Sequence, residues 1–266
     1  MLDRYELYEE VQGVLSIMGL EELPECRAYL AGLTAAGEGE IGAAPIEVAE
    51  ALMGMDRQEK LPEYMISFIT ELYESEAACG NDCAMNNLGA LYYNGARGFE
   101  QSFEKAMFYY KLAAARGNRQ ARENLGYCYY YGRGGAPDYE AAFRCFSLGA
   151  FEGSAVSLYK IGDMYLKGLY VEKDEQEAFR IYMSCLRAIS QEDESRASGP
   201  VHLRLGRMFL EGVGTEQSTA NALICFNKAE LCLYDMVARG ENMYRKSLKE
   251  AIEGHTRAGA LLEAMI

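Results

Sequence analysis

Cysteine and histidine are the side chains of this chain best suited to bind a metal ion or to act as nucleophiles. Cys79 and Cys83 are spaced so that both could ligate one zinc ion. A structural zinc site needs four ligands, and no second pair of ligands stands near these two cysteines in the sequence. We therefore predict that the protein binds no metal and uses no cofactor.

Motifs that would indicate catalysis are absent from the sequence. His202 and His255 have no nucleophile motif around them, and no G-x-S-x-G, H-E-x-x-H or G-x-x-x-x-G-K is present. The glycines at 132–135 and 212–214 resemble phosphate-binding loops, but they recur at a fixed spacing, which favours structural turns. The 40 acidic residues include no pair that stands out. We predict no catalytic residues and no enzymatic activity.

Small and apolar residues between Asn81 and Gly153 form one pattern that occurs twice. The two copies are 36 or 37 residues apart, and a constant period of this length is typical of a repeat array. The first copy is Ala84, Leu88, Gly89, Tyr92, Gly95, Ala106, Tyr110, Ala114 and Gly117, and the second is Ala121, Leu125, Gly126, Tyr129, Gly132, Ala142, Phe146, Ala150 and Gly153.

Each repeat is predicted to be two helices joined by a glycine turn. The apolar residues on either side of the turn are spaced by four, which is helical periodicity. The turn glycines can adopt positive φ and end the first helix, and Asp138 is placed to cap the second. Gly89 and Gly126 lie inside the first helix, where glycine costs about 1 kcal/mol relative to alanine. This cost predicts that another helix crosses closely there.

The pattern resembles the Sel-one-like repeat (SLR) family, a relative of the tetratricopeptide repeat. The family motif is A-x-x-x-L-G-x-x-Y-x-x-G-x-G, a short link, and then A-x-x-x-[YF]-x-x-x-A with a closing G, which the residues above match. The resemblance implies an all-α fold, a right-handed α-solenoid superhelix of helix-turn-helix repeats. A secreted branch of the family carries a regular cysteine pair in each repeat, and this chain lacks that pairing.

The repeat pattern divides the chain into four regions. We predict an acidic helical cap over 1–44, a degenerate repeat over 45–80, four repeats over 81–235 and a C-terminal capping helix over 236–266. A polar segment, 191–200, lengthens the spacing before the last repeat, and we expect a loop that ends at Pro200. The four repeats are predicted at 81–117, 118–153, 154–190 and 200–235.

Charge is concentrated at the N-terminal end of the chain. Residues 1–78 hold 17 acidic and four basic residues, whereas the remainder holds 23 and 22, so almost all of the net charge of −14 lies in the first part. Such a surface repels nucleic acids and anionic membranes. It is either a solubilising face or a docking surface for a basic partner. The sequence has no run of 18 apolar residues and no secretory signal, and we expect a cytoplasmic protein.

The resemblance also implies which residues face the concave groove. In tetratricopeptide repeats the first helix of each pair lines that groove, and its groove positions can be carried over by their offset from the motif glycine. Five of the carried positions are tyrosines outside the packing motif, which suit a binding surface because they combine a large ring with a polar group; they could equally be packing between helices. The predicted groove residues are Asn86, Tyr93, Asn94, Glu123, Tyr127, Tyr130, Tyr131, Tyr159, Asp163 and Arg207.

Two functions are compatible with these observations. The first is a non-catalytic scaffold or adaptor that binds a peptide or a partner protein in the groove. The alternative is a small-ligand binder or hydrolase, because some cysteine-rich members of the family are linked to β-lactam binding. An open channel would favour the scaffold, and a deep pocket with converging polar groups would favour the alternative.

Overall fold

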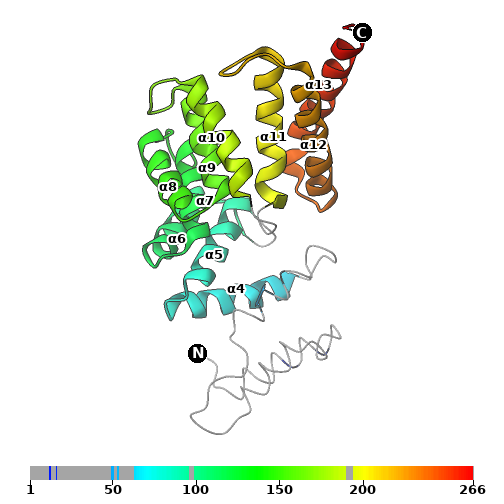
Figure 1. Cartoon of the computed structure of the whole chain (residues 1–266). Coiled ribbons are helices and arrows are strands. Elements are labelled where there is room, and N and C mark those ends of the chain that lie inside the picture. The colour runs from blue at the N-terminus through cyan, green and yellow to red at the C-terminus, as the bar shows by residue number, and fades with distance from the viewer. Residues whose placement is uncertain are drawn as a thin grey trace. The chain divides into compact units, whose positions relative to one another are not determined.

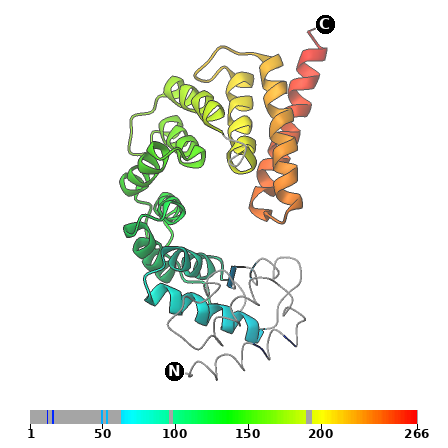
Figure 2. The same cartoon turned by 60° about the horizontal axis from the view of Figure 1, so that its bottom comes forward.

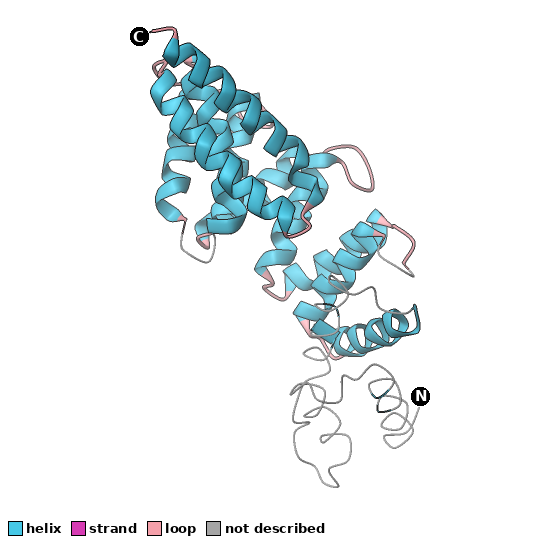
Figure 3. Ribbon diagram, turned by 90° about the vertical axis from the view of Figure 1, so that its right-hand side faces the viewer, coloured by secondary structure: helices cyan, strands magenta, loops and turns pink. Residues whose placement is uncertain are grey.

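The computed structural model describes residues 63–95, 99–189 and 194–265, with a few isolated residues before position 54. Within these ranges the chain is all-α, with ten α-helices, one short 3₁₀ helix and no strand (Figures 1 and 3). Most of the predicted N-terminal cap and most of the first half of the degenerate repeat lie outside the described residues, and the second half of that repeat contains a helix, Glu63–Ala78. The all-α helical-repeat fold predicted from the sequence is confirmed.

The helices alternate between two roles, which we call A and B after their order in each repeat. The A helices are α5 (Asp82–Asn94), α7 (Arg119–Tyr131), α9 (Ala155–Lys167) and α11 (Glu194–Glu211). The B helices are α6 (Phe103–Ala115), α8 (Tyr139–Phe151), α10 (Glu175–Ala188) and α12 (Thr219–Ala238). Helix α4 (Glu63–Ala78) precedes them, and η1 (Asn242–Tyr244) and α13 (Arg245–Glu263) follow.

The chain forms two compact units, Met1–Asn124 and Leu125–Ile266, whose boundary falls within α7. In unit 1, α5 packs between α4 and α6. In unit 2, α9 packs against α8 and α10, and α11 packs against α10 and α12. Helices α12 and α13 lie side by side at the C-terminal end (Figure 2).

Helix ends in both units are fixed by the same local chemistry. Asp138 Oδ1 accepts a hydrogen bond from the Ala141 backbone N–H at 2.9 Å, so this predicted cap is confirmed. Ser102, Asp174 and Ser218 cap the other B helices in the same way. Each cap satisfies one N–H that the first helical turn leaves unpaired, which contributes about 1 kcal/mol.

The motif glycine in each A helix makes room for an aromatic ring of its own B helix. A Cβ atom added at Gly126 would lie 2.6 Å from Phe146 Cε1, and one at Gly162 would lie 2.6 Å from Tyr182 Cε1. Phe146 and Tyr182 are fully buried, and burying a ring of this size contributes roughly 1.5–3 kcal/mol. The close crossing predicted from the helical glycines is therefore present.

The segment before the fourth repeat differs from the expected loop. Helix α11 begins at Glu194 and contains Pro200 in its interior, so the proline does not end the loop as predicted. The buried residues around it supply the reason. Ala197 and Val201 pack in the core with Cys185, and Gly199 lies against Leu233 of α12. Tertiary packing on both sides of the helix outweighs the loss of one backbone hydrogen bond.

Candidate functional site

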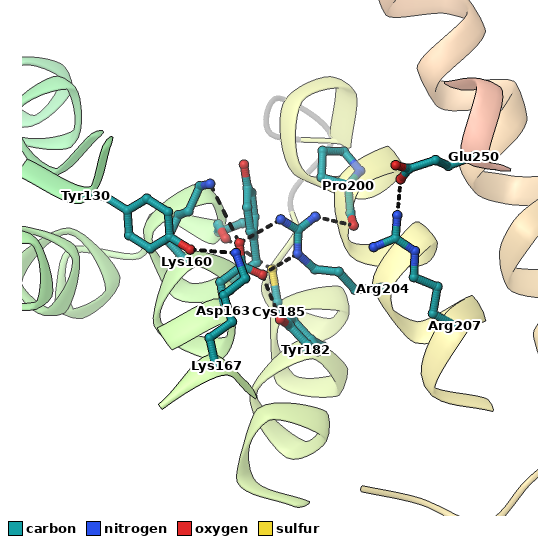
Figure 4. Close-up of polar contacts among 12 residues, drawn as sticks. Tyr130, Lys160, Asp163, Lys167, Tyr182, Cys185, Pro200, Arg204, Arg207 and Glu250 are labelled. Carbon is teal, nitrogen blue, oxygen red and sulfur yellow. Dashed lines mark hydrogen bonds and ion pairs between the residues drawn. The ribbon is translucent and has the colours of Figure 1, made fainter. Parts of the chain in front are cut away.

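Lys160 lies at the centre of a cluster of tyrosines and charged residues in unit 2 (Figure 4). Its Nζ atom is 4.9 to 5.4 Å from the centres of four tyrosine rings. Cations attract the faces of aromatic rings at such distances. We call the whole group the Lys160 cluster; its members are Tyr127, Tyr130, Tyr131, Tyr159, Lys160, Asp163, Lys167, Tyr182 and Arg204.

Asp163 is the carboxylate of this cluster, and Arg204 occupies both of its oxygens. The Arg204 guanidinium forms a bidentate ion pair with Asp163, including a 2.6 Å hydrogen bond to Oδ2. Tyr182 donates a 2.7 Å hydrogen bond to Oδ1. Burial alone would raise the pKa of Asp163, but Arg204 and the other donors bring it down to about 2. Asp163 is therefore ionised at neutral pH.

Lys160 shares the carboxylate of Asp163 with Arg204. Its Nζ atom is 3.6 Å from Asp163 Oδ2, an oxygen already bonded to Arg204, and donates a hydrogen bond to the Tyr131 hydroxyl at 3.2 Å. Burial lowers the pKa of Lys160 to about 8, with Arg204 and Lys167 acting in the same direction and Asp163 against it. The tyrosine rings thus supply much of the stabilisation that a paired carboxylate would otherwise provide.

The remaining contacts join three A helices. Tyr127 of α7 and Tyr159 of α9 share a hydrogen bond of 3.1 Å between their hydroxyls. Lys167 Nζ donates to the Tyr130 hydroxyl at 2.9 Å. The Arg204 guanidinium of α11 lies 4.8 Å from the Tyr159 ring centre. The cluster therefore connects α7, α9 and α11 through side chains.

Exposure separates the predicted groove residues of unit 2 into two kinds. Tyr130, Tyr159 and Asp163 are buried, with 3 to 6% of their surface exposed. Tyr131 is 51% exposed, and Arg207 is also exposed and pairs with Glu250 of α13. Tyr127 is partly buried. The buried members hold the helices together, whereas Tyr131 and the exposed Lys167 are accessible to another molecule.

The predicted groove residues of unit 1 form a different surface. Asn86 is buried and its Oδ1 accepts a 3.0 Å hydrogen bond from Asn124 Nδ2. Tyr93 packs against Phe103 with ring centres 5.3 Å apart. Asn94 is exposed and Glu123 is partly buried. These residues are neutral amides and rings apart from Glu123, and they form no cluster like that around Lys160.

Four members of the cluster are absent from the predicted groove residues: Lys160, Lys167, Tyr182 and Arg204. Lys160 and Arg204 lie two residues before the motif glycine of their helix, and Asn87 and Asn124 occupy the same position in the first two repeats. A polar residue at one fixed position in four amphipathic helices is a signal that could have identified them. In unit 2, the residue at this position contacts the residue that follows the motif glycine of the preceding A helix. Lys160 contacts Tyr127, and Arg204 contacts Asp163.

Among the described residues no three histidine, cysteine or acidic side chains are grouped to hold a metal ion. His202 Nδ1 lies 2.8 Å from the Ser198 carbonyl oxygen and 3.2 Å from its hydroxyl, but both residues are buried at neighbouring turns of α11. Such a pair fits helix packing better than attack on a substrate.

Comparison with known proteins identifies the repeats. The Sel1 repeat pattern matches residues 84–118, 119–153, 155–182 and 201–231. The chain is 30% identical over 111 residues to the ERAD-associated E3 ubiquitin-protein ligase component HRD3B of Arabidopsis thaliana, an alignment that spans 41% of this chain but only 17% of that protein.

Solved structures show the same fold. A protective antigen of uropathogenic Escherichia coli that displays an SLR fold matches with a TM-score of 0.63 and 22% identity, over 96% of this chain and 53% of the other. A Sel1 repeat protein from Oxalobacter formigenes matches with a TM-score of 0.60 and 18% identity, over 96% and 99%. With four matched repeats and the fold of these proteins, the chain belongs to the Sel1-like repeat family.

Proposed function

We propose that the chain is a non-catalytic scaffold that binds a protein partner over the exposed part of the Lys160 cluster. The observation that carries this proposal is the exposed rim of an otherwise buried cluster. Tyr131 leaves half of its surface open while Lys160 beneath it is only 4% exposed. A rigid aromatic side chain over a fixed polar network has the properties of an interface anchor, because little entropy is lost when a partner covers it.

The shape of this region supports a protein partner over a small ligand. Among the described residues, a depression of about 730 Å³ is lined by turn residues, and one of about 610 Å³ is lined by α4 and the α5–α6 connection. A third, of about 300 Å³, is lined by α11, α12 and α13. None of these three includes a member of the Lys160 cluster. These depressions therefore give no support to a small-ligand site within the cluster. No observation favours the β-lactam-type hydrolase considered above.

The relatives agree with an adaptor role. HRD3B is by its name a component of a ubiquitin-protein ligase, and its similarity to this chain lies in a 111-residue segment. Repeat segments of this kind stack into extended surfaces that suit partner binding. No described helix is apolar over a length sufficient to cross a membrane, and the cytoplasmic location expected from the sequence remains part of this proposal.

Affinity capture with the full chain tests the proposal. We expect partners retained by the wild-type chain to be lost with Tyr131→Ala and kept with Phe151→Ala, a control on B helix α8 that is 90% exposed. Truncating an interface anchor costs 2 kcal/mol or more, about a thirtyfold loss of affinity. Phe151→Ala should melt like the wild type, whereas Tyr131→Ala also loses a hydrogen bond from Lys160. Capture is therefore compared at a temperature at which all three chains are folded. Equal capture by all three chains would contradict the proposal.

Replacing Tyr131 tests the proposal more directly than replacing one of the buried tyrosines. Tyr130 is 6% exposed, and its ring packs against Tyr139 and Phe146. Its replacement by alanine would leave a cavity and lower the stability of unit 2. A loss of binding by such a variant would therefore not separate a contact residue from a packing residue.

A further inference from the structure

The Lys160 cluster contains more positive than negative charge. Lys160, Lys167 and Arg204 are cations, and Asp163 is the carboxylate that faces them. At the Tyr131 hydroxyl, burial and Asp163 raise the pKa, and Arg204, Lys167 and Arg133 act in the opposite direction, so the phenol keeps its proton. The sequence as a whole has a net charge of −14, so this local excess of positive charge is opposite in sign to the protein.

Two tyrosine hydroxyls in this cluster have a proton to donate. The Tyr131 oxygen accepts a hydrogen bond from Lys160, and the Tyr130 oxygen accepts one from Lys167. Among the described residues, neither hydroxyl donates to a protein acceptor. An ammonium group that donates to a phenol oxygen polarises the O–H bond and strengthens it as a donor. The two hydroxyls are thus donors suited to a charged acceptor.

A cationic ligand would not find the rings available. The four tyrosine faces that could receive it already surround Lys160 at 4.9 to 5.4 Å. A second cation would also lie close to Lys167 and Arg204, and like charges repel. The cluster is therefore suited to bind a hydrogen-bond acceptor that carries negative charge.

We propose that the exposed rim formed by Tyr131 and Lys167 binds a peptide segment rich in aspartate and glutamate. This proposal rests on the proposed function and names the chemistry of the partner. A side-chain carboxylate accepts from the Lys167 ammonium and from a tyrosine hydroxyl, while the exposed part of the Tyr131 side chain packs on neighbouring carbon atoms of the segment. Such contacts are charge-assisted hydrogen bonds, which are stronger than neutral ones.

A selection from a displayed library of random twelve-residue peptides tests this proposal, with the full chain as bait. We expect the enriched peptides to be acidic. Peptides from the enriched pool should bind Lys167→Gln about tenfold more weakly than the wild type, because a hydrogen bond to a charged group is lost. The matched control is Lys173→Gln, which removes the same charge from an exposed lysine in the α9–α10 turn.

The possible outcomes separate this inference from the proposed function. Acidic peptides that lose affinity for Lys167→Gln but not for Lys173→Gln support the inference. Neutral peptides that depend on Tyr131 would overturn it and leave the binding surface in place. Basic peptides would overturn it as well, and would indicate that Lys160 leaves its tyrosine cage to admit another cation. If no enriched peptide distinguishes the wild type from Tyr131→Ala, the proposed binding surface is wrong too.

Discussion

The A helices of the two units carry polar residues at the same position but use them differently. In unit 1, Asn124 donates to Asn86 and the pair is neutral. In unit 2 the corresponding residues are Lys160 and Arg204, which face Tyr127 and Asp163. The repeat therefore fixes where a polar side chain lies, and the residue type at that position decides whether the result is a hydrogen bond or a charged cluster.

The packing positions differ far less between the units. A Cβ at Gly89 would lie 2.6 Å from Tyr110, and one at Gly126 would lie 2.6 Å from Phe146. The four helix pairs thus share one way of packing, and the two units differ in the polar residue two positions before the motif glycine. Each of the following experiments alters one side of this comparison.

The largest effect is expected for Asp163→Ala. This change leaves Arg204 and Lys160 without their carboxylate in a mostly buried position. Breaking a buried ion pair by removing one partner costs about 3–5 kcal/mol, and the partial exposure of Arg204 places the loss near 3 kcal/mol. The free energy of unfolding, measured by urea titration, is the readout.

The matched change in unit 1 is Asn86→Ala, which removes a neutral hydrogen bond to Asn124. Its cost should be about 1 kcal/mol. Equal losses for Asp163→Ala and Asn86→Ala would show that the polar columns of the two units are energetically alike, contrary to the comparison drawn above.

Gly126→Leu is expected to destabilise the protein by about 1–3 kcal/mol. The new side chain would overlap the Phe146 ring and force the two helices apart. Gly89→Leu should cost a similar amount, because Tyr110 stands equally close. Gly135→Leu is the control, since no atom lies within 4 Å of its added Cβ. Melting temperatures of the three variants provide the test, and an unchanged value for Gly126→Leu would contradict close packing.

A smaller effect, of order 1 kcal/mol, is expected in the pH dependence of stability. The pKa of Lys160 is about 8 in the folded protein against 10.5 for an ordinary lysine. Between these values the unfolded chain binds more protons, so the free energy of unfolding should rise with pH. The groups around Lys160 are Asp163, Lys167, Arg204 and four tyrosines. Burial raises the pKa of the Tyr130, Tyr131 and Tyr159 hydroxyls above that of an ordinary tyrosine.

The control for this measurement is Lys160→Met, which removes the titrating group and retains an apolar side chain of similar length. Wild type and variant should be compared between pH 8 and about 9.5, before unfolded tyrosines ionise. The wild type should gain stability relative to the variant over this range. Parallel curves would mean that Lys160 keeps an ordinary pKa in the folded protein.

The fold was predictable from the sequence because its signals are local and repeated. The spacing of Leu125, Gly126 and Phe146 specifies a helix pair and its crossing point. Helix α11 was less predictable, since the strength of the packing that overrides Pro200 depends on residues of α10 and α12. Local sequence preference cannot include such distant contacts.

The site was predictable only in part. The position of Tyr131 on its A helix followed from its offset to the motif glycine. The burial of Tyr130 and Tyr159 could not be predicted in this way, because it depends on neighbouring helices. Lys160 and Arg204 were missed because a charged residue is expected at the surface. Their burial follows from the tyrosine rings and from Asp163, which lie on other turns and other helices.

Site-specific photo-crosslinking in cells tests the central claim most directly. A photoreactive phenylalanine analogue is placed at Asn94 in unit 1 or at Tyr131 in unit 2, two exposed residues five positions after their motif glycines. We predict a discrete crosslinked partner from position 131 and none from position 94. A partner captured from position 94 alone, or equally from both positions, would contradict the claim that the Lys160 cluster of unit 2 marks the binding surface.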